Sequence, residues 1–157
     1  MKGNEKMIEH LNRLLAEELT AINQYMVHAE MAENWGYKRI HKQIEDRAMA
    51  EMRHAEKLIA RIIFLEGRPT VNPPLTINIG SEVPKMHEND RLLEEGAIRG
   101  YNDSVRLAVE IGDNGTREIL VAILAEEEEH IDELEAQLDE IAQMGPQNYL
   151  VAQICKE

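Results

Sequence analysis

The chain has 157 residues, of which 43% are hydrophobic and only 4% aromatic, so we expect one domain over 1–157 with an aliphatic, methionine-rich core. Its 30 acidic residues outnumber its 17 basic residues, and the formal net charge is −13. This balance argues against nucleic-acid binding through a basic face and suits a protein that attracts cations.

Cysteine usage and hydropathy indicate the cellular compartment. The single cysteine, Cys155, excludes an internal disulfide and any Cys-x-x-Cys metal centre, and we expect it to be a small buried apolar residue. The first residues, Met1-Lys2-Gly3-Asn4, contain no apolar signal core, and no apolar run approaches the ~20 residues of a membrane span. These features predict a cytoplasmic protein without a membrane partner.

Helical periodicity dominates the first half of the chain. Asn4 is expected to cap a first helix that ends near residue 35. A second helix is predicted over about 38–66, where Gly67-Arg68-Pro69 stops it. Residues 67–82, which include Pro73-Pro74, are predicted to form an extended connection.

The second half has the same character. Ser81 is expected to cap a third helix that ends near residue 111, and a tight turn leads to a fourth helix over about 116–144. Gly145-Pro146 then starts a short fifth helix over about 146–156. Because the connection over 67–82 can reach about 50 Å when extended, the second and third helices can run parallel. The predicted fold is all-α, a four-helix bundle over about 4–144 with a long crossover between helices two and three.

Two copies of the pattern Glu-x-x-His lie inside the second and fourth predicted helices, at Glu51/His54 and Glu127/His130. Residues three apart share one face of a helix, so the carboxylate and the imidazole can bind one metal ion from the same side. One copy alone is weak evidence, because acidic helices produce it by chance and a solvated glutamate near an ordinary histidine explains it.

The spacing of the two copies is stronger evidence. Since 127 − 51 = 76, the two motifs are 76 residues apart, and the same offset relates Glu18 to Glu94 and Tyr25 to Tyr101. Four such matches indicate an internal repeat of two helix pairs. The repeat predicts the ligand pattern of the ferritin-like di-iron carboxylate bundles, made here by Glu18, Glu51, His54, Glu94, Glu127 and His130.

With these residues the chain resembles the bacterioferritins over essentially its whole length. The resemblance implies a hollow 24-subunit shell, built from two-fold dimers, that oxidises Fe(II) with oxygen or hydrogen peroxide as a ferroxidase and stores ferric mineral. It implies two iron ions per subunit, one served by Glu18 and His54, the other by Glu94 and His130, with Glu51 and Glu127 bridging. It also implies one haem b per subunit dimer, bound by Met52 of each chain, and a small ferredoxin as a partner for iron release.

Positions near the ligands carry further expectations. Tyr25 and Tyr101 lie seven residues after a ligand glutamate on the same inward face, where they could donate hydrogen bonds to ligands. Glu126 is also one turn from His130, but the repeat and the resemblance both favour Glu127, and the other glutamates of that run are interpreted as a solvated face. Some bacterioferritins carry an inner-surface iron site at the positions of Asp46 and Ala50, where this chain retains only one ligand.

The position of Met52 on its helix predicts an association surface. At about 100° per residue, Met52 points roughly 130° away from the direction of Glu51 and His54. The residues sharing this outer face are apolar: Leu19, Met26, Met49, Ile59 and Ile63. The residues 76 positions later are mostly polar, so we expect the first two helices to form a two-fold interface and the second pair to face water.

Other functions fit parts of the pattern. A non-storage di-iron peroxidase or oxidase of the rubrerythrin-like type would use similar ligands, although the cysteine pairs of the usual rubrerythrins are missing. A mini-ferritin that protects DNA is disfavoured by the net charge of −13 and the absence of a basic tail. A purely structural bundle is disfavoured because six converging ionisable side chains are costly to bury without a metal.

Overall fold

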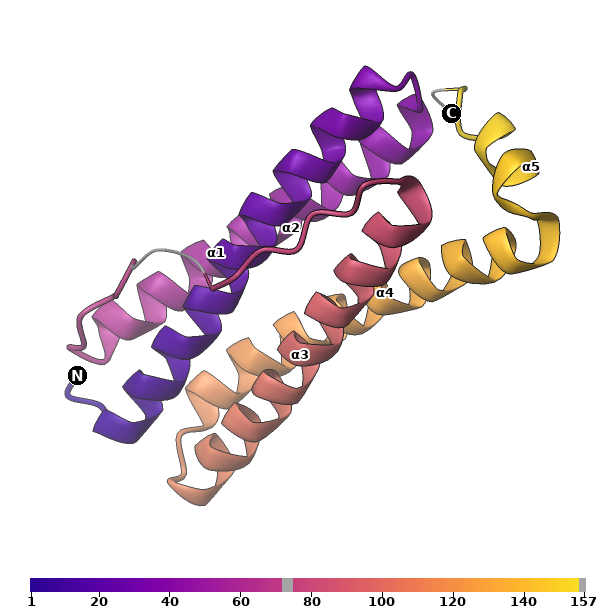
Figure 1. The fold of residues 1–157 in the computed structure, drawn as a ribbon. Helices are drawn as coiled ribbons and strands as arrows, with labels where there is room; N and C mark the ends of the chain where they lie inside the picture. The colour runs from indigo at the N-terminus through magenta and orange to yellow at the C-terminus, as the bar shows by residue number, and fades with distance from the viewer. Residues whose placement is uncertain (72–74, 156–157) are drawn as a thin grey trace.

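The computed structural model describes residues 1–71 and 75–155, and this part of the chain contains five helices and no strand. The helices are α1 (Glu5–Asn34), α2 (Lys38–Phe64), α3 (Val83–Glu110), α4 (Asn114–Met144) and α5 (Pro146–Val151). α1 and α2 form one antiparallel hairpin, α3 and α4 form a second, and α5 turns away at the end of α4 (Figure 1). The predicted four-helix bundle with a short fifth helix is confirmed.

The helix ends test the predicted caps. Asn4 caps α1 as expected, because its side chain accepts a backbone N–H of the first turn. Ser81 does not cap α3: the N-cap residue is Glu82, which has extended backbone and makes no side-chain capping hydrogen bond. α4 begins at residue 114 rather than 116, because the Asp113 carboxylate accepts the backbone N–H of Thr116 at 3.1 Å.

The crossover between α2 and α3 lies along α1 (Figure 1). Three α1 side chains, spaced one helical turn apart, accept backbone N–H groups of the crossover: Thr20 from Leu75, Gln24 from Asn78 and His28 from Gly80, at 2.8, 2.9 and 3.0 Å. This ladder fixes the path of the crossover, so α3 starts at the same end of the bundle as α2 and runs parallel to it. Pro73-Pro74 lies outside the described residues.

The C-terminal segment corrects two predictions. α5 ends at Val151 rather than near 156, and residues 152–155 form turns and bends. Cys155 is exposed, not buried as expected. Gln153 is buried, and its carbonyl oxygen accepts the backbone N–H of Arg39 at 3.1 Å, whereas Cys155, two residues later, reaches solvent.

α5 is attached to the bundle through Tyr149, which is fully buried and donates a hydrogen bond to Gln137. Its oxygen lies 3.0 Å from Nε2 of the buried His87. Burial, reinforced by the charge of Arg47, lowers the pKa of His87 to about 4.

This pKa predicts an acid-sensitive contact. Between pH 6.5 and about 4, His87 is protonated in the unfolded chain but remains neutral in the folded chain. The free energy of unfolding therefore falls as the pH drops through this range. The loss from this residue should approach about 3 kcal/mol at pH 4. Chemical unfolding at pH 7 and pH 4 should show a smaller loss in His87→Gln than in the wild type. An equal loss in both proteins would mean that His87 is not the acid-sensitive group.

The bundle core is divided into two apolar clusters. One surrounds Leu11, Leu58 and Ile123, and the other surrounds Ile40, Ile44 and Met86. Between them, buried charged side chains come from all four long helices. None of the described helices has the length and hydrophobicity to cross a membrane.

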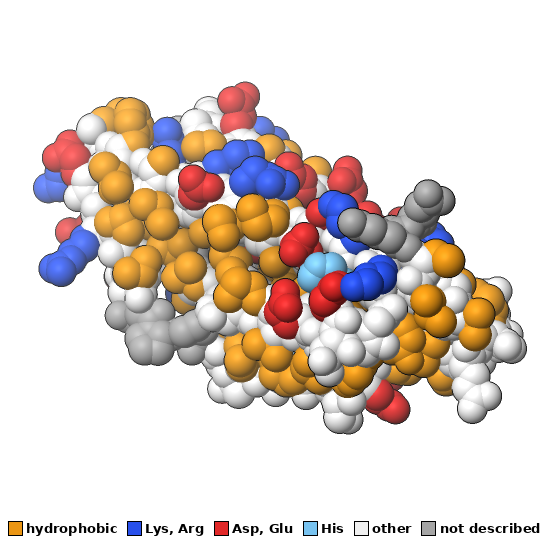
Figure 2. All heavy atoms as spheres, turned by 90° about the horizontal axis from the view of Figure 1, so that it is seen from above, with side chains coloured by type: hydrophobic (Ala, Val, Ile, Leu, Met, Phe, Trp, Pro, Cys, Tyr) orange, Lys and Arg blue, Asp and Glu red, His pale blue; other side chains and the backbone are white. Residues whose placement is uncertain are grey.

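The outer face of the α1–α2 hairpin is apolar, as predicted. Figure 2 shows hydrophobic side chains gathered there, with charged side chains at the edges. Met26, Met49, Met52 and Ile63 are each between 41% and 59% exposed, whereas Leu19 and Ile59 are half-buried. The corresponding positions of α3 and α4 carry mostly polar residues that reach solvent, including Asn102, Glu128, Glu135 and Asp139.

Candidate di-metal centre

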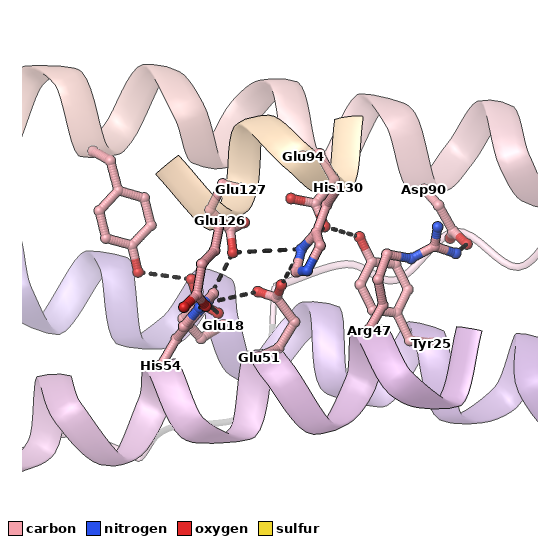
Figure 3. A network of polar contacts seen from close by, with 11 residues as sticks. Glu18, Tyr25, Arg47, Glu51, His54, Asp90, Glu94, Glu126, Glu127 and His130 are labelled. Carbon is pink, nitrogen blue, oxygen red and sulfur yellow. Dashed lines mark hydrogen bonds and ion pairs between the residues drawn. The ribbon is translucent and has the colours of Figure 1, made fainter. Parts of the chain in front are cut away.

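The six predicted ligands converge in the middle of the bundle (Figure 3). α1 contributes Glu18 and α3 contributes Glu94, whereas α2 and α4 each contribute a glutamate and a histidine three residues apart. The five ligands other than His130 are at most 1% exposed as whole residues. The helical spacing therefore places every predicted ligand on the inward face of its helix.

The ligands form two overlapping groups. Glu18 and His54 belong to one group, and Glu94 and His130 belong to the other. Glu51 and Glu127 belong to both, and within each group one ligand atom per residue lies within 4.8 Å of the others. Two metal ions that share two carboxylates have this arrangement.

The imidazoles point into the two groups through their Nδ1 atoms. His54 Nδ1 lies 2.8 Å from Glu127 Oε1 and 3.4 Å from Glu18 Oε2. His130 Nδ1 lies 2.9 Å from Glu51 Oε1 and 3.4 Å from Glu94 Oε1. The ring centroids are 6.2 Å apart, so each histidine can serve its own ion.

The hydrogen bonding of the centre is incomplete in a way that fits metal ions. Every one of the six residues has at least one buried nitrogen or oxygen atom without a hydrogen-bond partner in the described part of the chain. Buried polar atoms without partners are rare in folded proteins, since each costs about 1–3 kcal/mol. Oxygen and imidazole donors together suit iron, and the four carboxylates offset the charge of two divalent ions.

Electrostatics point in the same direction. Burial and the neighbouring carboxylates raise the pKa of Glu18 and of Glu127. For Glu51, burial raises the pKa, but the close contacts with Glu18 and with the two histidines outweigh burial and lower it. Burial would lower the pKa of both histidines, but the glutamates around them raise the pKa of His54 to about 10 and that of His130 to about 9. The metal-free centre therefore holds protons that bound cations would displace.

Both predicted tyrosines contact ligands across the bundle. Tyr101 on α3 donates a hydrogen bond to Glu18 on α1 at 2.7 Å, and Tyr25 on α1 donates one to Glu94 on α3. The two contacts are related by the 76-residue repeat. Each hydroxyl fixes a glutamate that belongs to only one of the two ligand groups.

A buried polar network beside Tyr25 was not anticipated. The guanidinium carbon of Arg47 lies 5.0 Å from the Tyr25 ring centroid, and Arg47 Nη2 is 3.5 Å from Asp90 Oδ2. Asp90 Oδ1 also accepts a hydrogen bond from Gln24 and contacts His28 Nδ1, both at 2.8 Å. Asp90 lies one turn before the ligand Glu94 on the inward face of α3, and this spacing could have predicted that it is buried near the centre. The network links the crossover to the residue that holds Glu94.

The glutamates at 126–129 of α4 agree only in part with the prediction. Glu127 enters the centre, and Glu128 and Glu129 are exposed, as predicted. Glu126 is not simply solvated, because its carboxylate pairs with Nε2 of His54. Spacing along α4 related Glu126 to His130, whereas its actual partner comes from the neighbouring α2.

α2 also carries Met52, the predicted haem ligand, and Asp46, the one ligand retained at the inner-surface position. Met52 and the nearby Met26 and Met49 line a groove of about 230 Å³. A thioether in an apolar groove fits an axial ligand of haem iron. At the inner-surface position, Asp46 is exposed and pairs with Lys42 at 2.6 Å, and Ala50 has no side chain that could bind a metal.

Comparisons with known proteins agree with this geometry. The ferritin-like domain family matches residues 8–144. The chain is 41% identical to a bacterioferritin of Brucella melitensis over 95% of this chain and 92% of the relative. It is 39% identical to a bacterial ferritin of Pseudomonas aeruginosa (98% and 100%) and 40% identical to a bacterioferritin of Streptomyces coelicolor (96% and 90%). The chain forms a ferritin-like bundle with two Glu-x-x-His motifs at its centre, and relatives of this similarity cover nearly its whole length. It therefore belongs to the bacterioferritin family.

Proposed function

We propose that the protein is an iron-storage ferroxidase that acts as one domain. It binds two Fe(II) ions, passes two electrons to one molecule of oxygen or hydrogen peroxide, and stores the ferric product inside a hollow shell of 24 chains. The observation that carries the proposal is the convergence of six ligand residues, each with a buried atom that has no hydrogen-bond partner among the described residues.

The ligand residues have distinct roles in this proposal. Glu18 and His54 bind one iron ion, Glu94 and His130 bind the other, and Glu51 and Glu127 bridge them. This division is supported by the two overlapping groups, which share only the bridging residues. Tyr25 and Tyr101 hold Glu94 and Glu18 in place, which limits the reorganisation needed when iron binds.

Haem b and the shell extend the proposal beyond the single chain. The apolar outer face of α1 and α2 would pair with the same face of a second chain around a two-fold axis. Met52 of each chain would then bind one shared haem, which supplies a redox centre for the release of stored iron, with a small ferredoxin as electron donor. The exposed methionines and their groove support this assignment.

Particle size combined with iron capacity tests the proposed function. Twenty-four chains of 18.0 kDa should elute as a particle of about 430 kDa. After repeated aerobic additions of Fe(II), this particle should retain far more than two iron ions per chain. A small oligomer that consumes peroxide and retains only two iron ions per chain would overturn storage and favour the rubrerythrin-like alternative.

A further inference from the structure

His54 is held from two sides. Its Nδ1 atom faces the centre, 2.8 Å from Glu127 Oε1, while its Nε2 atom pairs with the carboxylate of Glu126. The His54 side chain is completely buried, whereas that of Glu126 is 46% exposed. The pair therefore joins α2 to α4 at the border between the centre and solvent (Figure 3).

His130 has no equivalent support in the described part of the chain. Its Nδ1 atom faces Glu51 and Glu94, but its Nε2 atom makes no hydrogen bond or ion pair with any described residue. The repeat explains the difference, because 126 − 76 = 50 and residue 50 is Ala50, which offers no acceptor. The 76-residue repeat therefore relates the six ligands to one another, but it does not relate the residues that support the two imidazoles.

We propose that Glu126 is a positioning residue that makes the Glu18–His54 metal position the tighter of the two. This inference rests on the proposed di-iron function and adds that the two metal positions differ in affinity. A neutral imidazole carries one N–H, and a carboxylate at Nε2 keeps that hydrogen there, so Nδ1 presents its lone pair to the ion. His130 must instead adopt its tautomer and ring orientation as the ion binds.

The expected size of the effect follows from exposure. Because Glu126 is partly exposed, solvent screens the charge of its carboxylate, and its main contribution is to orient the ring. Loss of a residue that supports a metal ligand typically lowers metal affinity by about 10- to 100-fold. We therefore expect a loss of about 10-fold at the Glu18–His54 position.

Cobalt(II) binding to the assembled full-length protein tests the inference, since this ion mimics Fe(II) without oxidising in air. The wild type should bind two ions per chain in two steps, and anomalous diffraction at one ion per chain should show the Glu18–His54 position filled first. Glu126→Ala should weaken the first step by about 10-fold and equalise the two occupancies. Glu126→Gln, which keeps an acceptor oxygen, should show an intermediate loss.

Glu129→Ala is the matched control, because Glu129 is an exposed glutamate of the same run and contacts none of the ligands in the described structure. It should leave both steps unchanged. Equal filling of the two positions in the wild type, or the same isotherm for Glu126→Ala and Glu129→Ala, would overturn the inference but leave a di-metal centre in place. Failure of the wild type to bind two cobalt ions would instead count against the proposed function.

Discussion

Replacing Glu127 by glutamine is expected to slow the initial oxidation of Fe(II) by more than about 100-fold, beyond the loss typical of residues that only support a ligand. Glu127 belongs to both ligand groups, and both of its carboxylate oxygens are buried with no hydrogen-bond partner from residues 1–71 or 75–155. Glutamine keeps the shape of the side chain, but it removes the negative charge and replaces one of the two carboxylate oxygens with an NH2 group, which has no lone pair to offer a cation. Stopped-flow absorbance after mixing Fe(II) with aerobic protein measures the rate.

The adjacent Glu128 provides the control for this experiment. It has the same side chain on the same helix, but it is exposed and belongs to neither ligand group. Glu128→Gln should therefore oxidise Fe(II) at the wild-type rate, and both variants should elute as the same assembled particle. A normal fast phase in Glu127→Gln, or an equal loss in Glu128→Gln, would contradict the assignment of Glu127 as a bridging ligand.

Much of this centre could be predicted because helices convert sequence spacing directly into geometry. Residues three apart face the same way, so Glu51 and His54 had to point together wherever α2 packs. The 76-residue offset then placed Glu127 and His130 on the equivalent face of α4. The tyrosines followed from the same periodicity, although spacing alone did not show that each one contacts a glutamate of the opposite hairpin.

The features that escaped prediction depend on contacts between elements. The pairing of Glu126 with His54 depends on how α4 is rotated against α2, which spacing along one helix does not determine. The exposure of Cys155 depends on where the tail separates from the bundle after Gln153. Ser81 had the chemistry of a cap, but α3 begins at Val83, one residue later than a Ser81 cap requires, so Glu82 occupies the N-cap position.

Replacing Met52 on the outer face of the α1–α2 hairpin by leucine is expected to abolish haem binding. Met52 is 41% exposed although it lies beside the ligand Glu51, because successive helical residues point in different directions. In the proposed two-fold interface a residue near the axis would meet its own symmetry mate, so Met52 of each chain would hold one shared haem through its thioether sulfur. Leucine keeps the apolar contact but has no sulfur, so dimer packing should survive while the axial ligand is lost.

Met49→Leu separates ligation from packing. Met49 lines the same groove and is 47% exposed, so its substitution removes a comparable thioether from the same surface. After reconstitution with haem, the wild type and Met49→Leu should show the same Soret band at one haem per two chains, whereas Met52→Leu should show none. All three proteins should oxidise Fe(II) at similar initial rates, since neither methionine belongs to the ligand groups. If Met52→Leu binds haem with an unchanged spectrum, Met52 only packs in the interface and another residue must supply the axial ligand.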